Sequence, residues 1–158
     1  MNNLAAGAAF AVMTLFANTA RADDKGVVTT FYTQVLSGTT AADLADRVNK
    51  VIASDWQSIG GYAGAPKTRE QFTQQLQGFG KLIPDLTWKI EEIVREGDRY
   101  VVRGRATGTP AGEFFGVAPT GKRFDIMSID IHTVKGGKIV KTYHVEDWAG
   151  AIRQLRAQ

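Results

Sequence analysis

The hydrophobic pattern of this chain changes its period at Pro84. Before Pro84, apolar residues recur every three or four positions, as at Val27, Phe31 and Val35, which is typical of amphipathic helices. After Pro84 they alternate with polar residues, which is typical of strands that have one face on a core. Helices followed by strands favour an α+β fold, in which the helices cover one face of an antiparallel sheet.

Three helices are predicted before Pro84 and four strands after it. The first helix spans residues 24–36, the second is capped by Thr40, and the third follows the capping-box pair Thr68 and Gln71. The segment between the second and third helices, residues 54–67, is predicted to be irregular. The predicted strands cover residues 86–95, 99–109, 122–134 and 138–148, and a helical turn over residues 149–156 closes the chain.

A cleavable leader is predicted at the N-terminus. Residues 4–17 are apolar and uncharged, and Ala20-Arg21-Ala22 is a small-x-small cleavage site. The apolar run is shorter than the roughly 20 residues of a membrane span, so we expect no stable membrane insertion after cleavage. The start, Met1-Asn2-Asn3, has no charged side chain, and an uncleaved anchor is the alternative. The expected organisation is a signal peptide, residues 1–22, and a single domain, residues 23–158, that is periplasmic or secreted.

The composition argues against several classes of function. The chain has no cysteine, which excludes thiol chemistry and cysteine metal sites. Its formal net charge is +3 and its basic residues never form a run longer than two, so nucleic acid is not an expected partner. The glycines Gly104, Gly108 and Gly112 lack the spacing of a phosphate-binding loop, and no serine lies in a nucleophile elbow. No cofactor is expected.

The final hairpin turns at Gly136-Gly137, and the type of turn decides which residues share a face. A two-residue type I′ turn pairs Lys135 with Lys138 and mixes polar and apolar residues on both faces. A type I turn with Gly137 as a bulge residue pairs Val134 with Lys138 and separates the two kinds of residue, so we adopt it. Its core-facing set is Met127, Ile129, Ile131, Ile139, Tyr143, Val145 and Asp147, and its outward set is Ser128, Asp130, His132, Thr142, His144 and Glu146.

In this register Asp147 is an acid among apolar neighbours. Burial would raise the pKa of its carboxyl group and prepare it for proton transfer near neutral pH. The alternative is that Asp147 caps the helical turn that follows it, and spacing alone favours the cap.

The chain has two histidines, His132 and His144, which the same register turns outward with Asp130 and Glu146. A hydrogen-bonded network at the surface or in an interface is the simplest interpretation. A metal site formed by both histidines and one of the acids is the alternative, although no HExxH-like spacing supports it.

Aromatic side chains are numerous enough to line a pocket as well as to fill a core. Small residues at Gly104, Ala106 and Gly108 would leave room for a ligand or let the sheet curve. The candidate substrate-binding residues are Tyr143, Met127, Trp56, Phe72, Trp88 and Phe114.

Two segments of the chain resemble the SnoaL-like polyketide cyclases, or ester cyclases, of the nuclear transport factor 2-like superfamily. They are GTPAGEFFGVAPTGK, residues 108–122, and the block from Lys138 to Leu155. The resemblance implies a cone-shaped fold with three N-terminal helices packed on a strongly curved, mainly antiparallel sheet. It also implies that Asp147 is the general acid/base and that the sheet forms a homodimer. Two histidines usual in the family correspond here to Pro110 and Thr133.

The function expected from the sequence is therefore that of an exported SnoaL-like protein that binds a small hydrophobic, carbonyl-bearing molecule in its cone. Acid/base chemistry of a cyclase or isomerase type would proceed through Asp147 without a cofactor. The alternative is a non-catalytic ligand-binding or dimerisation module.

Overall fold

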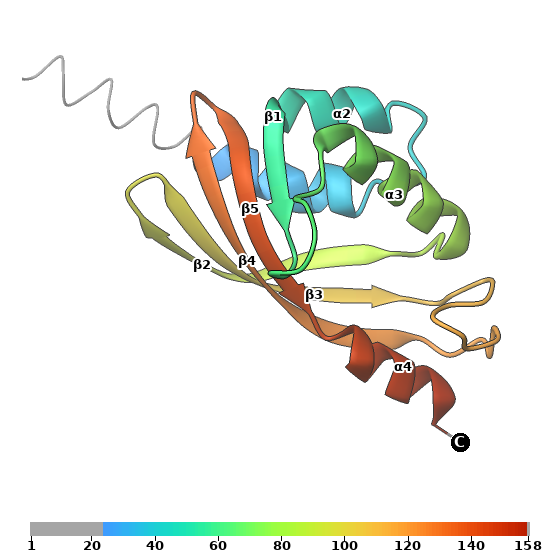
Figure 1. The fold of residues 1–158 in the computed structure, drawn as a ribbon. Helices are drawn as coiled ribbons and strands as arrows, with labels where there is room; N and C mark the ends of the chain where they lie inside the picture. The colour runs from blue at the N-terminus through green and yellow to red at the C-terminus, as the bar shows by residue number, and fades with distance from the viewer. Residues whose placement is uncertain (1–23, 158) are drawn as a thin grey trace, which may run out of the picture.

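The computed structural model describes residues 24–157, which form a curved sheet with helices on one side and a short helix at its end (Figure 1). The predicted signal peptide, residues 1–22, lies outside the described residues. In chain order the elements are η1 (Phe31–Leu36), α2 (Leu44–Val51), β1 (Ile52–Ile59), α3 (Arg69–Leu82), β2 (Thr87–Glu96), β3 (Arg99–Gly108), β4 (Phe124–Lys135), β5 (Lys138–Glu146) and α4 (Trp148–Arg156). No helix within the described residues is both long enough and apolar enough to span a membrane.

The helices begin close to where the sequence predicts them. Residues 24–30 are α-helical and continue directly into η1, which has the wider winding of a π-helix. The second helix begins after Asp43 and not at the predicted Thr40 cap. Thr68 caps α3 and forms the predicted capping box with Gln71.

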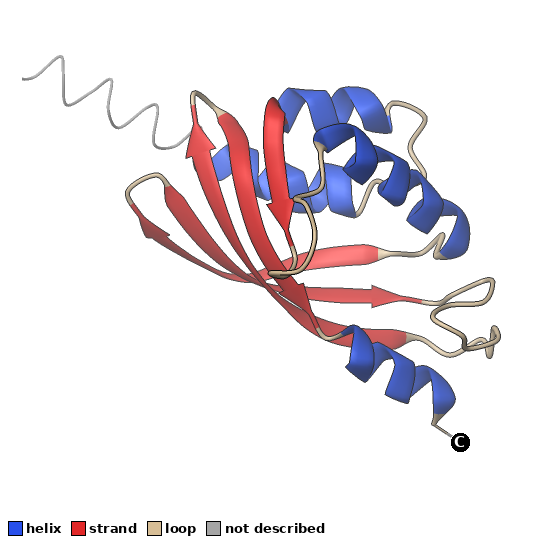
Figure 2. Cartoon of the chain, in the orientation of Figure 1, coloured by secondary structure: helices blue, strands red, loops and turns tan. Residues whose placement is uncertain are grey.

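The sheet has the order β1-β5-β4-β3-β2, in which only β1 and β5 run parallel. It curls around the N-terminal helix, α2 and α3, so its concave face is covered (Figure 2). The predicted α+β class and the mainly antiparallel, curved sheet are therefore confirmed. The core consists largely of apolar side chains between these helices and the concave face.

One strand was not predicted. β1 lies at the edge of the sheet, over part of the segment that the sequence predicts to be irregular. It buries Ile52, Trp56 and Ser58. A register shift between Ile52 and Gln57 breaks the alternation, and the buried set includes a serine, so no clear period of two marks this strand in the sequence.

The final hairpin combines the two features that the sequence analysis treats as alternatives. Gly136 and Gly137 have φ angles of 57° and 71°, and Lys135 pairs with Lys138, as in a type I′ turn. The adopted register is therefore wrong at the turn. A bulge follows at Val140, because Val134 pairs with Ile139 whereas Thr133 pairs with Lys141.

Beyond Val140 the bulge places polar and apolar residues on separate faces, as predicted. The prediction of which face covers the core is wrong, because the polar face lies inside and the apolar face lies outside. Asp130 and His132 are 5% and 0% exposed and lie on the concave face, whereas Met127 and Val145 are 55% and 62% exposed on the convex face. The polar residues can be buried because they hydrogen-bond to one another and to Tyr32.

Candidate functional site

A cavity of about 120 Å³ lies between the helices and the concave face of the sheet, and is called here the interior pocket. Its walls combine aromatic and polar side chains, and four of the polar ones come from the last two strands. The aromatic residues are Phe31, Trp56, Phe72, Phe79, Trp88 and Trp148.

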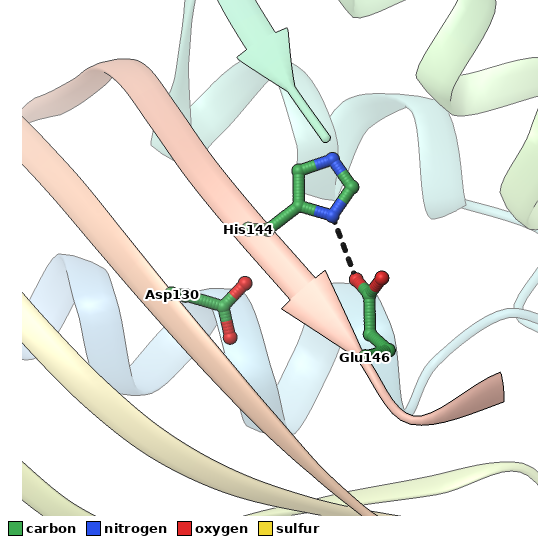
Figure 3. A group of neighbouring side chains, drawn as sticks. All are labelled: Asp130, His144 and Glu146. Atoms are coloured by element: carbon green, nitrogen blue, oxygen red, sulfur yellow. Dashed lines mark hydrogen bonds and ion pairs between the residues drawn. The ribbon is translucent and has the colours of Figure 1, made fainter. Parts of the chain in front are cut away.

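Three of these polar residues, Asp130, His144 and Glu146, lie close together and are called here the polar trio (Figure 3). Asp130 on β4 and His144 on β5 are directly opposite in the register, and Glu146 lies two residues beyond His144 on the same face. One carboxylate oxygen or ring nitrogen from each lies within 4.8 Å of those of the other two. His144 Nδ1 and Glu146 Oε1 are 2.8 Å apart.

A buried chain of hydrogen bonds ends at Asp130. The Tyr32 hydroxyl donates to Asp130 Oδ2 at 2.6 Å. Since that hydroxyl has one proton, its 3.1 Å contact with His132 Nε2 requires His132 to donate, so His132 Nδ1 accepts from Thr142 at 3.0 Å. Thr142 in turn accepts from Trp56 Nε1 at 3.1 Å. While Asp130 is ionised, every donor in the chain is therefore directed toward it.

The environment sets the protonation of these groups. Burial raises the pKa of Asp130 to about 6, against the lowering effect of the hydrogen bond from Tyr32. Burial lowers the pKa of His132 to about 3, so this imidazole is neutral, as its place in the chain requires. The hydrogen bond to Glu146 raises the pKa of His144 above its ordinary value. The pocket thus contains a carboxyl group with a pKa of about 6 and an imidazole whose pKa lies above its ordinary value.

Asp130 has one oxygen that remains available to the pocket. The hydrogen bonds that it receives from Tyr32 and Ser128 both reach Oδ2, and none from the described residues reaches Oδ1. Gly104 on β3 lets these partners approach, because a Cβ atom there would lie 2.6 Å from Ser128 Oγ and 3.4 Å from the Tyr32 ring. The room that the small residues of β3 were predicted to leave is filled at Gly104 by these two side chains.

The sequence pattern of the SnoaL-like polyketide cyclases matches residues 26–155 of this chain. The chain belongs to this family. No curated protein sequence matches it.

Solved structures of the same fold include several related proteins. IdmH from Streptomyces antibioticus, described as a candidate polyketide cyclase, is 28% identical with a TM-score of 0.72, over 85% of this chain and 99% of its own. A candidate SnoaL-like polyketide cyclase from Jannaschia sp. CCS1 is 21% identical with a TM-score of 0.74, over 87% of this chain and 94% of its own. TsrD from Streptomyces laurentii is 20% identical with a TM-score of 0.72, over 87% and 98%. The last two similarities show the fold alone.

Three of the predicted substrate-binding residues of this SnoaL-like chain, Trp56, Phe72 and Trp88, do line the interior pocket. Tyr143 and Met127 do not, because the inverted faces place them on the exposed convex side of the sheet.

Phe114 was also predicted to bind substrate, and the structure buries it beside the pocket and not in its wall. Its ring lies 5.9 Å from Phe124 in a stacked arrangement and 5.8 Å from Trp148, edge to face. Phe114 therefore supports Trp148, which does line the pocket.

Asp147, predicted as the catalytic acid of this SnoaL-like chain, lies outside the pocket. Its side chain is exposed and accepts a hydrogen bond from Gly150 N at 2.7 Å, which caps α4, and Arg153 lies 3.7 Å away. The prediction that it faces the core is wrong, and the cap that spacing favoured is present. The acids that the last two strands do bring to the pocket are Asp130 and Glu146.

Sequence reasoning missed the polar trio as pocket residues and Tyr32 as the hydrogen-bond partner of Asp130. One signal in the sequence is the number of polar side chains that alternation places on the same face of β4 and β5. Polar side chains that are numerous and adjacent can be buried together, because they can form hydrogen bonds with one another. Tyr32 beside Phe31 on the first helix is a second signal, because it adds a hydroxyl group to an otherwise apolar helix face.

The polar trio is also the set of described residues with the spacing of a metal site. One histidine with two carboxylates is a donor set used by zinc and manganese. The alternative metal site with both histidines is not formed, because both ring nitrogens of His132 are engaged by Tyr32 and Thr142. The charge of Lys67, which lowers the pKa of His144, would also oppose the binding of a cation.

Proposed function

We propose that this chain binds a small hydrophobic molecule with a carbonyl group in the interior pocket and moves a proton on it, in a reaction of the cyclase or isomerase type. The proposal depends most on Asp130, a buried carboxyl group with a pKa of about 6 and one oxygen without a hydrogen bond from the described residues. Membership of the SnoaL-like family supports a cyclase-like, ligand-binding fold.

In the proposed first step the Asp130 carboxylate removes a proton from the carbon next to the carbonyl group. The C–H electron pair moves into the new carbon–carbon double bond, and the carbonyl oxygen becomes an enolate oxygen. Asp130 is then neutral, which is the form that burial favours. The imidazolium form of His144, favoured by Glu146, places a positive charge near the enolate.

The second step distinguishes the two reaction types. If neutral Asp130 returns its proton to a different carbon, the substrate is isomerised. If the enolate carbon attacks a second carbonyl group of the same molecule, a ring closes and the new alkoxide takes the proton from Asp130. Both routes restore the carboxylate and consume no cofactor.

The chain of hydrogen bonds from Trp56 through Thr142 and His132 to Tyr32 positions Asp130 for this chemistry. Tyr32 holds Oδ2 at 2.6 Å, so Oδ1 is the oxygen that can meet the substrate. Because the pKa of His132 is about 3, this imidazole stays neutral across the pH range in which Asp130 titrates.

Deuterium exchange tests the proposal without knowledge of the natural substrate. Acetophenone is incubated with the protein in D₂O, and deuterium in its methyl group is measured by mass spectrometry. We expect the wild type to accelerate exchange and Asp130→Asn to remove the acceleration, while Asp55→Asn on the exposed part of β1 retains it. Equal rates for the wild type and Asp130→Asn would contradict the proposal.

We further propose that the chain is a homodimer through the convex face of the sheet. One row of apolar side chains crosses all five strands on that face, because the register aligns Ile59, Tyr143, Ile131, Val101 and Val94. Tyr143, Val101 and Val94 are 38%, 37% and 55% exposed. A second copy of the same row would cover it, since a two-fold interface brings one patch onto itself.

Export remains part of the proposal, supported by the apolar segment and the Ala20-Arg21-Ala22 site. Mass spectrometry of the protein recovered from the producing cell tests it, with a mature N-terminus at Asp23 as the expected result. An intact Met1 would contradict cleavage.

A further inference from the structure

Lys67 lies at the rim of the interior pocket. It immediately precedes the cap of α3, and its backbone exchanges hydrogen bonds of 2.9 and 3.0 Å with that of Ser58 on β1, which fixes the base of the side chain. The half-buried side chain lines both the interior pocket and a second hollow, which is bounded by residues 58–67 together with Tyr143 and His144. Lys67 is therefore positioned where the pocket meets the surface.

The hydrogen-bond partner of Lys67 belongs to the same rim. Lys67 Nζ donates to Gln75 Oε1, and Gln75 is an exposed residue of α3 that also lines the pocket. Because an ammonium group can only donate, the Gln75 oxygen must face Lys67, which leaves Nε2 as a donor. Among the described residues none accepts a hydrogen bond from Nε2, and Nζ keeps two further protons. Two neighbouring side chains of the rim thus offer unused donors to a bound molecule.

The charge of Lys67 has no counterion at contact distance. No carboxylate of the described residues forms an ion pair with Nζ, and Glu146, the acid whose charge acts on it, is hydrogen-bonded to His144 at 2.8 Å. Burial lowers the pKa of Lys67 against the raising effect of Glu146, so the protein does not fully offset the desolvation of the ammonium. The same positive charge lowers the pKa of His144, which places it near the polar trio. An anionic ligand would supply the missing charge.

We propose that the ligand of the interior pocket is an aromatic oxo acid whose carboxylate binds Lys67 Nζ and Gln75 Nε2 at the rim. A carboxylate has two oxygens and can accept from both donors at once. It keeps part of its hydration there, because Gln75 is exposed and Lys67 is only half-buried, while the ring lies among the aromatic side chains of the pocket. The inference rests on the proposed function for the carbonyl group, to which it adds a carboxylate as a second recognised group.

Benzoylpropionate and its primary amide provide the test, because they share a ring and a carbonyl group, have nearly the same shape and differ in one negative charge. Their dissociation constants are measured by calorimetry for the wild type, Lys67→Gln and Lys81→Gln. The wild type should bind the acid at least about tenfold more tightly than the amide, and Lys67→Gln should remove most of that preference.

Lys81→Gln is the matched control, because Lys81 is exposed near the C-terminal end of α3 and does not line the pocket. It should keep the wild-type preference for the acid. A wild type without that preference, an unchanged preference in Lys67→Gln, or an equal loss in both variants overturns the assignment.

Nitrogen-15 NMR of the wild-type protein gives a second reading that does not depend on the folding of a variant. The side-chain N–H signals of Gln75 should shift when benzoylpropionate is added. Those of Gln77, which is exposed on the same helix and does not line the pocket, should stay in place. Unmoved Gln75 signals at saturating ligand, or equal shifts at the two glutamines, overturn the site at the rim.

Both readings concern binding alone, so they are separate from the test of the proposed function. Deuterium exchange in acetophenone can fail while the effect of Lys67 persists, which would reject the acid/base proposal and keep the carboxylate site. Exchange that depends on Asp130, together with equal affinity for the acid and the amide, would keep the chemistry and reject the carboxylate site.

Discussion

Asp130 on β4 and His144 on β5 face each other across the strand pair, on the side of the sheet that the helices cover. Both line the interior pocket, and the pKa of each is raised, though by different causes. Burial raises the pKa of Asp130, and the hydrogen bond to Glu146 raises that of His144. A carboxyl group with a raised pKa beside an imidazole that favours its charged form suits proton transfer on a bound carbonyl compound.

Asp130→Asn is expected to stabilise the fold and to abolish the acceleration of deuterium exchange in acetophenone. The pKa of Asp130 is about 6 in the folded protein against an ordinary value of 3.8, so the folded state binds more protons than the unfolded state between these values. The ionised carboxylate therefore costs stability above pH 6, and this cost disappears as the pH falls from 6 to about 4. We expect the variant to gain about 3 kcal/mol in urea unfolding at pH 8 and about nothing at pH 4.

The matched control for this measurement is Asp55→Asn, since Asp55 is exposed on β1. It should show no comparable gain at pH 8. If Asp130→Asn destabilised the protein at pH 8 and also exchanged at the wild-type rate, Asp130 would be a structural residue.

Tyr32→Phe is expected to raise the pKa of Asp130 above its value of about 6. The hydroxyl of Tyr32 donates to Oδ2 at 2.6 Å and stabilises the carboxylate, so its removal favours the protonated form. The rise of the exchange rate with pH should then shift to higher pH, and the carbon-13 signal of the Asp130 carboxyl should titrate at higher pH. Tyr143→Phe, on the convex face, is the control and should leave both unchanged. Coincident titrations for Tyr32→Phe and the wild type would show that the hydrogen bond does not act on Asp130.

The class of fold could be predicted because helices and strands have different hydrophobic periods. Apolar spacing gave the N-terminal helix and the four long strands, and capping chemistry gave the start of α3 at Thr68. The edge strand β1 could not be found in the same way, since its bulge and its buried Ser58 remove the alternation.

The site was harder to predict because the sequence sorts residues between two faces without saying which face is inside. Polar residues were assigned to solvent, yet Asp130 and His132 are buried because Tyr32, almost one hundred residues earlier, supplies their hydrogen bonds. A partner so distant in sequence cannot be deduced from the strands alone. Asp147 illustrates the converse, since its local position before a helix was enough to indicate the cap.

Asp147→Ala is expected to cost about 1 kcal/mol of stability through loss of the α4 cap, with Asp147→Asn costing less because Asn also caps helices. Neither change should alter deuterium exchange, because Asp147 does not line the interior pocket. Urea unfolding and the exchange assay measure the two effects. Loss of exchange in Asp147→Asn at unchanged stability would restore the role that the sequence predicts.

Removal of metal ions is expected to leave exchange unchanged. The proposed chemistry uses the protons of Asp130 and His144, and the charge of Lys67 lies close enough to His144 to lower its pKa and to oppose a cation. Protein purified without an affinity tag is treated with EDTA and assayed, then assayed again with added Zn²⁺ or Mn²⁺. Activity that disappears with EDTA and returns with one metal would show instead that the polar trio is a metal site.

Val101→Lys is expected to convert the proposed dimer into a monomer. Val101 lies on β3 within the apolar row, between its partner Ile131 on β4 and its partner Val94 on β2. A lysine there would bring a charge into the interface at a cost in desolvation, and a two-fold interface would repeat the cost in the other copy. Gln77→Lys on the exposed side of α3 is the control for the added charge and should remain dimeric. Sedimentation velocity at equal concentrations separates the outcomes, and a wild-type protein that sediments as a monomer at high micromolar concentration would contradict the interface.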